Sequence, residues 1–126
     1  MVADQCSAEA ERKVVPVTEI PEGWKALDIG PRTIEAYSIP LSRAKTILWF
    51  GPIGVFEFEA FAKGTRVLTE VMIKSGATTI VGGGDSASAV EKLGLQDKMS
   101  LVSTGGGASL EMIEGKELPA LKVLER

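Results

Sequence analysis

The residues Thr78-Thr79-Ile80-Val81-Gly82-Gly83-Gly84-Asp85-Ser86 set the pattern for the whole chain. A short run rich in β-branched residues ends in a triple glycine, and an acidic residue and a hydroxyl residue follow. A strand-like run that ends in a triple glycine recurs, without the acidic residue, at Met99-Ser100-Leu101-Val102-Ser103-Thr104-Gly105-Gly106-Gly107-Ala108-Ser109. Each stretch predicts a strand that ends in a glycine turn and leads into a helix. Backbone amides at such turns, helped by the N-terminus of the following helix, hold phosphate in many α/β proteins.

A third strand-to-loop segment precedes these two glycine turns. Residues 46–50 are an apolar run of strand length, and Gly51-Pro52-Ile53-Gly54 follows them. Between the expected strands, apolar residues recur at three- and four-residue spacing, which predicts helices. These helices are expected over residues 58–75, 85–93 and 108–114. Strands that alternate with helices and are joined by short glycine links predict a parallel sheet of the α/β class.

The N-terminal third of the chain is less regular. Residues 25–30 resemble a strand that ends at a glycine, and residues 32–39 have near-helical apolar spacing after Pro31. We expect Pro40 to break or restart that helix, because proline lacks the amide donor. The opening Met1-Val2-Ala3-Asp4 reads as the end of a strand whose beginning is absent. We therefore expect a Rossmann-like three-layer fold with a parallel sheet that is incomplete, as part of a doubly wound domain.

The composition limits the possible functions. Of 126 residues, 44% are hydrophobic and 25% are charged, with a net charge of −3, which is ordinary for one globular domain or part of one. A pI near 5.0 leaves no basic surface for a phosphate backbone, so we expect no nucleic acid as a partner. The chain has no histidine and one cysteine, Cys6. His-ligated zinc, histidine acid–base chemistry and an internal disulfide are therefore excluded.

The hydropathy pattern also indicates the cellular compartment of the protein. No stretch approaches the roughly 18 apolar residues of a membrane span. The N-terminal residues lack the basic and apolar regions of a secretory signal. We expect a cytoplasmic protein without a membrane partner, and a plastid origin stays open.

The glycine turns match no common nucleotide motif. The chain contains no G-x-x-x-x-G-K-[ST], and neither triple glycine satisfies G-x-G-x-x-G. A single triple glycine is explained equally well by a tight turn in which a helix packs closely on a strand, without any binding role. Two of them at equivalent strand ends favour a binding site.

Asp85 and Ser86 each allow two interpretations. Asp85 suits the N-cap of a helix, or a contact to a Mg²⁺ ion that is bound to phosphates. Ser86 either caps the same helix or donates its hydroxyl to a phosphate. From the sequence, the N-cap is slightly favoured for Asp85.

Two further carboxylates are expected near the ends of strands. Glu57 follows the loop after the strand at residues 46–50, where a carboxylate can accept hydrogen bonds from a ribose diol. It equally suits the first turn of a helix, where the helix dipole favours an acidic residue. Asp28 is interpreted as structural.

Four long motifs occur in order along the chain. They are Trp49-Phe50-Gly51-Pro52-Ile53-Gly54-Val55-Phe56-Glu57, Gly82-Gly83-Gly84-Asp85-Ser86, Ser103-Thr104-Gly105-Gly106-Gly107-Ala108-Ser109-Leu110-Glu111 and Glu114-Gly115-Lys116-Glu117-Leu118-Pro119. Leu27-Asp28-Ile29-Gly30-Pro31 and Val2-Ala3-Asp4 add to them. Together these motifs resemble phosphoglycerate kinase over essentially the whole chain.

The resemblance implies an enzyme of two doubly wound α/β domains. It would transfer phosphate between 1,3-bisphosphoglycerate and ADP, in glycolysis and carbon fixation. The chain resembles only the latter part of the C-terminal domain, which binds Mg²⁺ with ADP or ATP, so residues 1–126 are expected to form a partial nucleotide-binding domain. The N-terminal domain, which holds 3-phosphoglycerate through a basic patch, is absent from this chain.

The resemblance also implies roles for single residues. The nucleotide-binding residues that it implies are Pro52, Val55, Glu57, Gly83, Gly84, Asp85 and Ser86. Of these, Glu57 would hydrogen-bond the ribose, and Asp85 would contact the metal. The amides of Gly84 and Gly107 would act in catalysis by stabilising charge on the phosphoryl group in transfer. Phosphoryl transfer depends mainly on positioning and charge stabilisation, which fits that role.

The chain departs from the family at several points. Phe50 stands where the family has an asparagine beside the phosphate site, so a polar amide is lost and bulk is added. Leu101 replaces a histidine that is usual in the family. The chain also lacks the substrate domain with its arginines and the lysine-bearing loop of the C-terminal domain. We therefore expect that the chain alone does not catalyse the reaction.

Two functions from different classes remain. The first is an enzyme fragment, whose natural partner is the remainder of the enzyme. The second is a structural or interaction subunit of a larger assembly, derived from phosphoglycerate kinase. The start of the chain inside a strand and the presence of Phe50 motivate the second.

Overall fold

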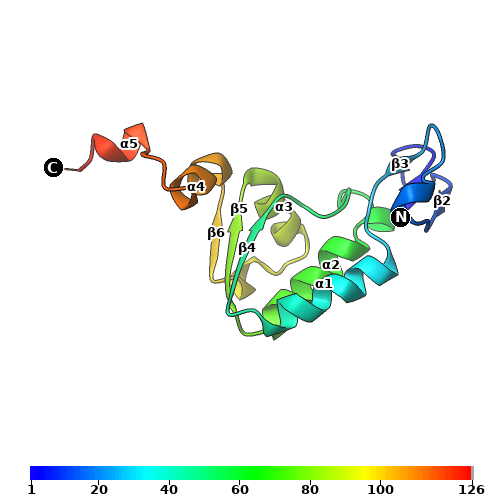
Figure 1. Ribbon diagram of the computed structural model, residues 1–126, viewed down its shortest axis with the longest axis horizontal. Coiled ribbons are helices and arrows are strands. Elements are labelled where there is room, and N and C mark those ends of the chain that lie inside the picture. The colour runs from blue at the N-terminus through cyan, green and yellow to red at the C-terminus, as the bar shows by residue number, and fades with distance from the viewer. Residues whose placement is uncertain (126) are drawn as a thin grey trace.

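The computed structural model describes residues 1–125, which form two small sheets joined and flanked by helices (Figure 1). Sheet A lies near the N-terminus and is antiparallel, in the order β2-β1-β3. Its strands are β1 (Val2–Ala3), β2 (Arg12–Lys13) and β3 (Lys25–Ala26). Sheet B is parallel, in the order β4-β5-β6. Its strands are β4 (Thr46–Phe50), β5 (Thr78–Gly82) and β6 (Leu101–Ser103).

Helices link the strands of sheet B, as expected for the α/β class. The helices are α1 (Pro31–Arg43), α2 (Lys63–Lys74), α3 (Gly84–Lys92), α4 (Gly106–Ile113) and α5 (Pro119–Lys122), with short 3₁₀ turns η1 (Val17–Glu19), η2 (Glu59–Phe61) and η3 (Gln96–Lys98). Helices α1 and α2 lie side by side, and α5 lies at the end of the molecule opposite sheet A (Figure 1). The expected α/β fold with a parallel sheet is confirmed. Within residues 1–125, no helix is long and apolar enough to cross a membrane.

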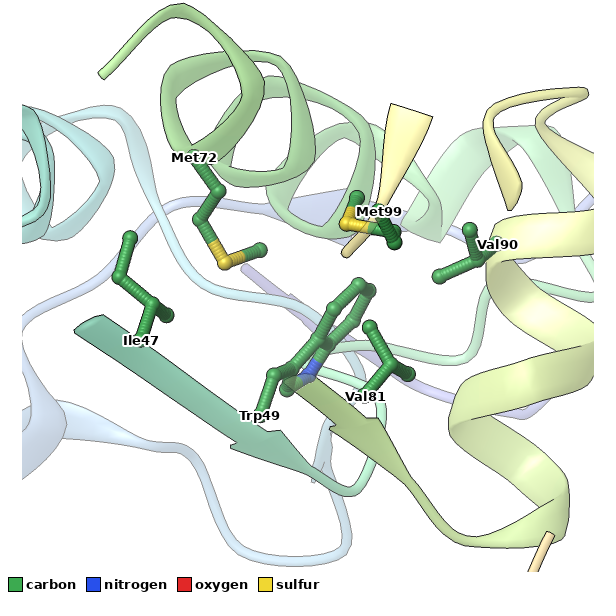
Figure 2. Close-up of a cluster of buried hydrophobic side chains, with 6 residues drawn as sticks. All are labelled: Ile47, Trp49, Met72, Val81, Val90 and Met99. Atoms are coloured by element: carbon green, nitrogen blue, oxygen red, sulfur yellow. The ribbon is translucent and has the colours of Figure 1, made fainter. Parts of the chain in front are cut away.

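One face of sheet B forms the main hydrophobic core. Its buried members are Ile47, Trp49, Met72, Val81, Val90 and Met99, whose side chains converge in Figure 2. Residues 47 and 49 alternate with exposed residues along β4, which is the two-residue period of a strand buried on one face. Helix α2 contributes Met72 and helix α3 contributes Val90, so both helices cover the same face of the sheet.

The opposite face of sheet B is open. Leu48 of β4, Ile80 of β5 and Leu101 of β6 are in register across the three strands and so share this face. Leu48 is 47% exposed and Leu101 is 54% exposed. The doubly wound domain is therefore incomplete on this side.

The prediction that Pro40 breaks the first helix is wrong. Helix α1 continues through Pro40 to Arg43. A proline at this position deprives the carbonyl of Ala36 of its amide partner. Both Pro40 and Ala36 are exposed, so water can hydrate that carbonyl, and the helix tolerates the proline.

The helix predicted over residues 58–75 starts later than expected, at Lys63. The buried carboxylate of Asp28 accepts hydrogen bonds from the amides of Gly64 (2.9 Å) and Ile29 (2.8 Å). It thus satisfies one of the donors that the first turn of α2 leaves without a partner. A Cβ on Gly64 would collide with the Asp28 carboxylate and lie 2.6 Å from Ile29, so the glycine permits this close approach. Asp28 is structural, as predicted.

Candidate functional site

The three strands of sheet B end side by side. Phe50, Gly82 and Ser103 are the last residues of β4, β5 and β6, and they are in register with one another. The loops that follow the strands therefore leave from one edge of the sheet. Ligands of open α/β sheets bind at this carboxyl edge.

The two glycine turns are in direct contact. The amide of Gly83 donates to the carbonyl oxygen of Ser103 at 2.8 Å. A Cβ on Gly106 would lie 2.8 Å from the Cα of Gly83 and 3.0 Å from its nitrogen. Only a residue without a side chain allows this approach, and it places the first turns of α3 and α4 next to each other.

Helix α3 begins directly at the first glycine turn. Gly83 is its N-cap residue, with a φ of 102° that glycine adopts at little cost. Asp85 is the second helical residue and is exposed, and no side chain caps this helix. The slightly favoured N-cap interpretation of Asp85 is therefore wrong, which leaves the carboxylate available to other partners. Among residues 1–125, the amides of Gly84 and Asp85 have no acceptor, as is usual in the first turn of a helix.

Ser86 lies below the turn rather than in the open site. Its side chain is 1% exposed. Its hydroxyl oxygen accepts a hydrogen bond from the amide of Gly51 at 2.6 Å. The carbonyl of Gly51 in turn accepts from the indole nitrogen of Trp49 at 2.6 Å. Ser86 thus ties α3 to the loop after β4, which the sequence did not reveal.

Helix α4 begins at the second glycine turn in a similar way. Gly105 is its N-cap residue, and its amide donates to the hydroxyl of Ser103 at 3.2 Å. Gly107 is the second helical residue and is exposed, and a Cβ there would meet no atom within 4 Å. Among residues 1–125, the amide of Gly107 has no acceptor, as is usual in the first turn of a helix.

The loop that carries Pro52, Val55 and Glu57 lies between sheet A and sheet B. The amide of Val55 donates to the carbonyl of Leu27 at 2.8 Å. Pro52 and Val55 are half-buried, and Glu57 is exposed. The positions implied by the resemblance thus lie on one loop, with the Glu57 carboxylate open to solvent.

A cleft of about 250 Å³ lies beside Glu57, between the start of α2 and the outer side of α3. Its charged lining residues are Glu57, Glu59, Arg66 and Lys92. The guanidinium of Arg66 lies 3.2 Å from the carboxylate of Glu59. The ammonium of Lys92 donates to the carbonyl oxygens of Glu57 (2.8 Å) and Phe56 (3.2 Å). Sequence reasoning missed Lys92, because a lysine in the last turn of a helix is common and carries no motif.

Phe50 lies across Gly82 at the edge of the sheet. A Cβ on Gly82 would collide with three atoms of the Phe50 ring. The two residues are paired across β4 and β5, so the ring occupies the space that the missing side chain leaves. An apolar ring therefore borders the first glycine turn.

The donor set restricts the kind of metal ion that the site fits. Within residues 1–125, no group of three or more histidine, cysteine, aspartate or glutamate side chains gathers to form a metal cage. Asp85 is a single exposed carboxylate at a helix N-terminus. A Mg²⁺ ion typically uses one or two carboxylates together with phosphate oxygens and water. The residues present fit that arrangement.

Comparison with known proteins decides the family. The family model described as phosphoglycerate kinase matches residues 1–116. The chain belongs to the phosphoglycerate kinase family. Members of this family are kinases, which are transferases.

Individual phosphoglycerate kinases are similar along the whole chain. The chain is 57% identical to the enzyme of Chloroflexus aurantiacus over 99% of its length and 56% identical to that of Rubrobacter xylanophilus over 98%. It is 54% identical, over 99% of its length, to the cytosolic phosphoglycerate kinase of Triticum aestivum. In each case the chain spans 32% of the relative, about a third of its length.

A solved structure agrees with the fold. Phosphoglycerate kinase from Coxiella burnetii superposes with a TM-score of 0.89 at 49% identity, covering 98% of this chain and 32% of that one. The enzyme from Pyrococcus horikoshii superposes with a TM-score of 0.72 at 41% identity, covering 81% of this chain and 25% of that one. The chain, with its three-stranded parallel sheet and the exposed apolar face of that sheet, thus corresponds to about a third of such an enzyme.

Proposed function

We propose that this chain supplies the part of a phosphoglycerate kinase that binds Mg²⁺ with ADP or ATP. The contact between Gly83 and Gly106 carries the proposal, because it brings two helix N-termini to one point. Helix N-termini present unpaired amides and a partial positive charge, which suits phosphate groups. The amides of Gly84 and Gly107 belong to these two first turns.

In this proposal the two glycine turns have different roles where the phosphates bind. The first turn of α3, with Gly84, meets the nucleotide phosphates, and Asp85 holds the Mg²⁺ that neutralises part of their charge. The amides of Gly84 and Gly107 stabilise charge on the phosphoryl group in transfer. Gly83 shapes this turn rather than donating to phosphate, since its amide already bonds to Ser103. Ser86 likewise contributes by holding the loop after β4 in place.

The loop after β4 serves the nucleoside end. Pro52 and Val55 line the nucleotide pocket, and the exposed carboxylate of Glu57 accepts hydrogen bonds from the ribose hydroxyls. Support comes from the position of this loop, which starts at the same edge of sheet B as the glycine turns.

In the whole enzyme, phosphate moves between 1,3-bisphosphoglycerate and ADP. Residues 1–126 would contribute a partial C-terminal domain, and 3-phosphoglycerate would be held by a substrate domain that this chain does not contain. The support is that the chain spans about a third of its relatives. The chain alone is therefore inactive, and the remainder of the enzyme is its partner.

Equilibrium binding of Mg-ADP to residues 1–126, followed by calorimetry, tests this proposal. We expect saturable binding that weakens at least tenfold in Asp85→Asn, which loses the carboxylate proposed for Mg²⁺, and in Glu57→Ala, which loses charged hydrogen bonds to the ribose worth about 1.5–3 kcal/mol. Asp97→Asn changes an exposed carboxylate of η3 and serves as the matched control. The absence of binding by the unmodified chain contradicts the proposal. Turnover by the purified chain in a coupled ATP assay contradicts its inactivity.

The open apolar face of sheet B favours a second candidate function. Leu48 and Leu101 are about half exposed there, and large exposed apolar patches mark interaction surfaces. The chain would then be a non-catalytic structural or interaction subunit of a larger assembly. Stable co-purification with a partner, together with no binding of Mg-ADP, would favour this candidate over the first.

A further inference from the structure

Lys92 occupies the end of α3 opposite the glycine turn. It is the last residue of the helix, whereas Asp85 is the second. The rise of an α-helix separates these two residues by about 10 Å along its axis. Helix α3 thus extends from the phosphate end of the proposed site to the loop that carries Glu57.

The ammonium of Lys92 binds that loop through two backbone carbonyls. It donates to the carbonyl oxygen of Glu57 at 2.8 Å and to that of Phe56 at 3.2 Å. The ammonium also lies 5.9 Å from the centroid of the Phe56 ring, within the range of a cation–π contact. These contacts join residues that are 35 and 36 positions apart in the sequence.

The loop has few other hydrogen bonds at this point. The amide of Phe56 donates to Gly54 at 2.9 Å, and the amide of Phe58 donates to Val55 at 3.1 Å, both within the loop itself. Among residues 1–125, the backbone carbonyl oxygens of Phe56 and Glu57 accept a hydrogen bond from no donor other than the Lys92 ammonium. Lys92 is therefore the hydrogen-bonded link between the backbone at Phe56 and Glu57 and the end of α3.

We infer that Lys92 is a positioning residue for nucleotide binding, which holds the ribose-binding Glu57 at a set distance from the phosphate-binding turn of α3. This inference rests on the proposed function. In this role Lys92 makes no contact with the phosphates of the nucleotide, since its ammonium donates to the two backbone carbonyls. Its removal loosens the nucleoside end of the site while the phosphate end, built from the contact of Gly83 with Gly106, keeps its geometry.

Two probes separate the two ends of the site. Binding of Mg-ADP and of inorganic pyrophosphate with Mg²⁺ is measured by calorimetry on the full chain. We expect Lys92→Met to weaken Mg-ADP binding about three- to tenfold, the loss expected for one or two hydrogen bonds, and to leave pyrophosphate binding within twofold. Lys92→Arg keeps a cationic donor and restores most of the affinity for Mg-ADP. Lys98→Met removes an exposed lysine from η3 and is the matched control.

Hydrogen exchange gives a second measurement that does not depend on a ligand. We expect faster exchange of the Phe58 amide in Lys92→Met, with the amide of Gly83 unchanged. Equal affinity of Lys92→Met and the unmodified chain for Mg-ADP overturns the positioning role alone. An equal loss for Mg-ADP and pyrophosphate also overturns it, because it shows a general loss of structure. If the unmodified chain binds no Mg-ADP, the proposed function fails and the positioning role fails with it.

Discussion

Phe50 has a double effect at the residue scale. Its ring fills the space over Gly82 and so adds packing at the end of β4. It also puts an apolar group beside the first glycine turn, where the family resemblance implies a polar amide. A charged phosphate near this edge gains no hydrogen bond from the ring.

We predict that Phe50→Asn strengthens the binding of Mg-ATP about fivefold. One added hydrogen bond is worth about 1 kcal/mol, which corresponds to that factor. Calorimetry on the purified chain measures the change, and Phe50→Leu, which adds no polar group, is the control. Unchanged or weaker binding by Phe50→Asn would show that the ring does not limit the site.

Asp28 shows a different residue effect, because its carboxylate is buried. Burial, at 9% exposure, raises the pKa of Asp28 above 3.8, and the hydrogen bonds from Gly64 and Ile29 oppose this rise only in part. The folded chain therefore holds this proton more tightly than the unfolded chain does.

The contribution of Asp28 to the free energy of unfolding therefore decreases as the pH rises. The stabilisation linked to the Asp28 proton is fully present below pH 3.8 and is lost as the pH rises through the raised pKa. Asp28→Asn does not titrate at this position. We predict that the free energy of unfolding of the wild type, minus that of Asp28→Asn, falls as the pH rises over this window. Urea unfolding at a series of pH values measures it, and a difference that is constant or grows with pH is the contrary result.

At the scale of elements, the site depends on how closely α3 and α4 approach each other. Each helix by itself is a short segment that begins at a glycine turn. The contact of Gly106 with the backbone of Gly83, together with the hydrogen bond from Gly83 to Ser103, brings the two first turns side by side. Backbone atoms cannot move aside as a flexible side chain can, so this contact leaves no room for a methyl group.

We predict that Gly106→Ala destabilises the chain by about 1–3 kcal/mol, the usual cost of overpacking, and weakens pyrophosphate binding. The neighbouring Gly107→Ala is the matched control, because its added methyl group meets no protein atom within 4 Å. That variant should keep the stability of the wild type within about 0.5 kcal/mol or exceed it slightly, since alanine favours a helix. Urea unfolding of both variants measures the difference. Equal stability of the two variants would mean that the turns are not tightly packed.

At the scale of the whole molecule, sheet B is covered on one face and open on the other. Helices α2 and α3 pack against the face that contains Trp49 and Val81. The row formed by Leu48, Ile80 and Leu101 has no such cover. Doubly wound α/β domains have helices on both faces of the sheet, and this chain spans about a third of the length of its relatives.

We predict that the double substitution Leu48→Thr and Leu101→Thr lowers the binding of a hydrophobic fluorescent dye. Threonine retains the preference for a strand, so each change should alter the free energy of unfolding by no more than about 0.5 kcal/mol, as for other surface positions. Val17→Thr removes an exposed apolar side chain of η1 and is the control. Dye fluorescence that stays at the wild-type level in the double variant would show that this face is not the exposed apolar surface.

Local sequence determined the elements of sheet B and the order in which they follow one another. The strand predicted at residues 46–50 is β4 with the same bounds, because a short apolar run bounded by a glycine turn is typical of a buried strand. The turns at Gly83 and Gly105 also lie where they were predicted, and Gly83 has a positive φ that favours glycine. The motifs that resemble phosphoglycerate kinase include these same glycine turns.

Contacts between distant residues decided the rest, and no local pattern encodes them. The start of α2 at Lys63 depends on the Asp28 carboxylate, 36 residues from its partner Gly64. The buried hydroxyl of Ser86 became a partner of Gly51, 35 residues away, instead of a free donor. Lys92 acquired its two carbonyl acceptors over a similar separation. The sequence by itself therefore determined which groups the proposed site contains. The tertiary structure decided which of them lack a protein partner among residues 1–125, because a hydrogen-bonding group is available to a ligand only where packing leaves it unpaired.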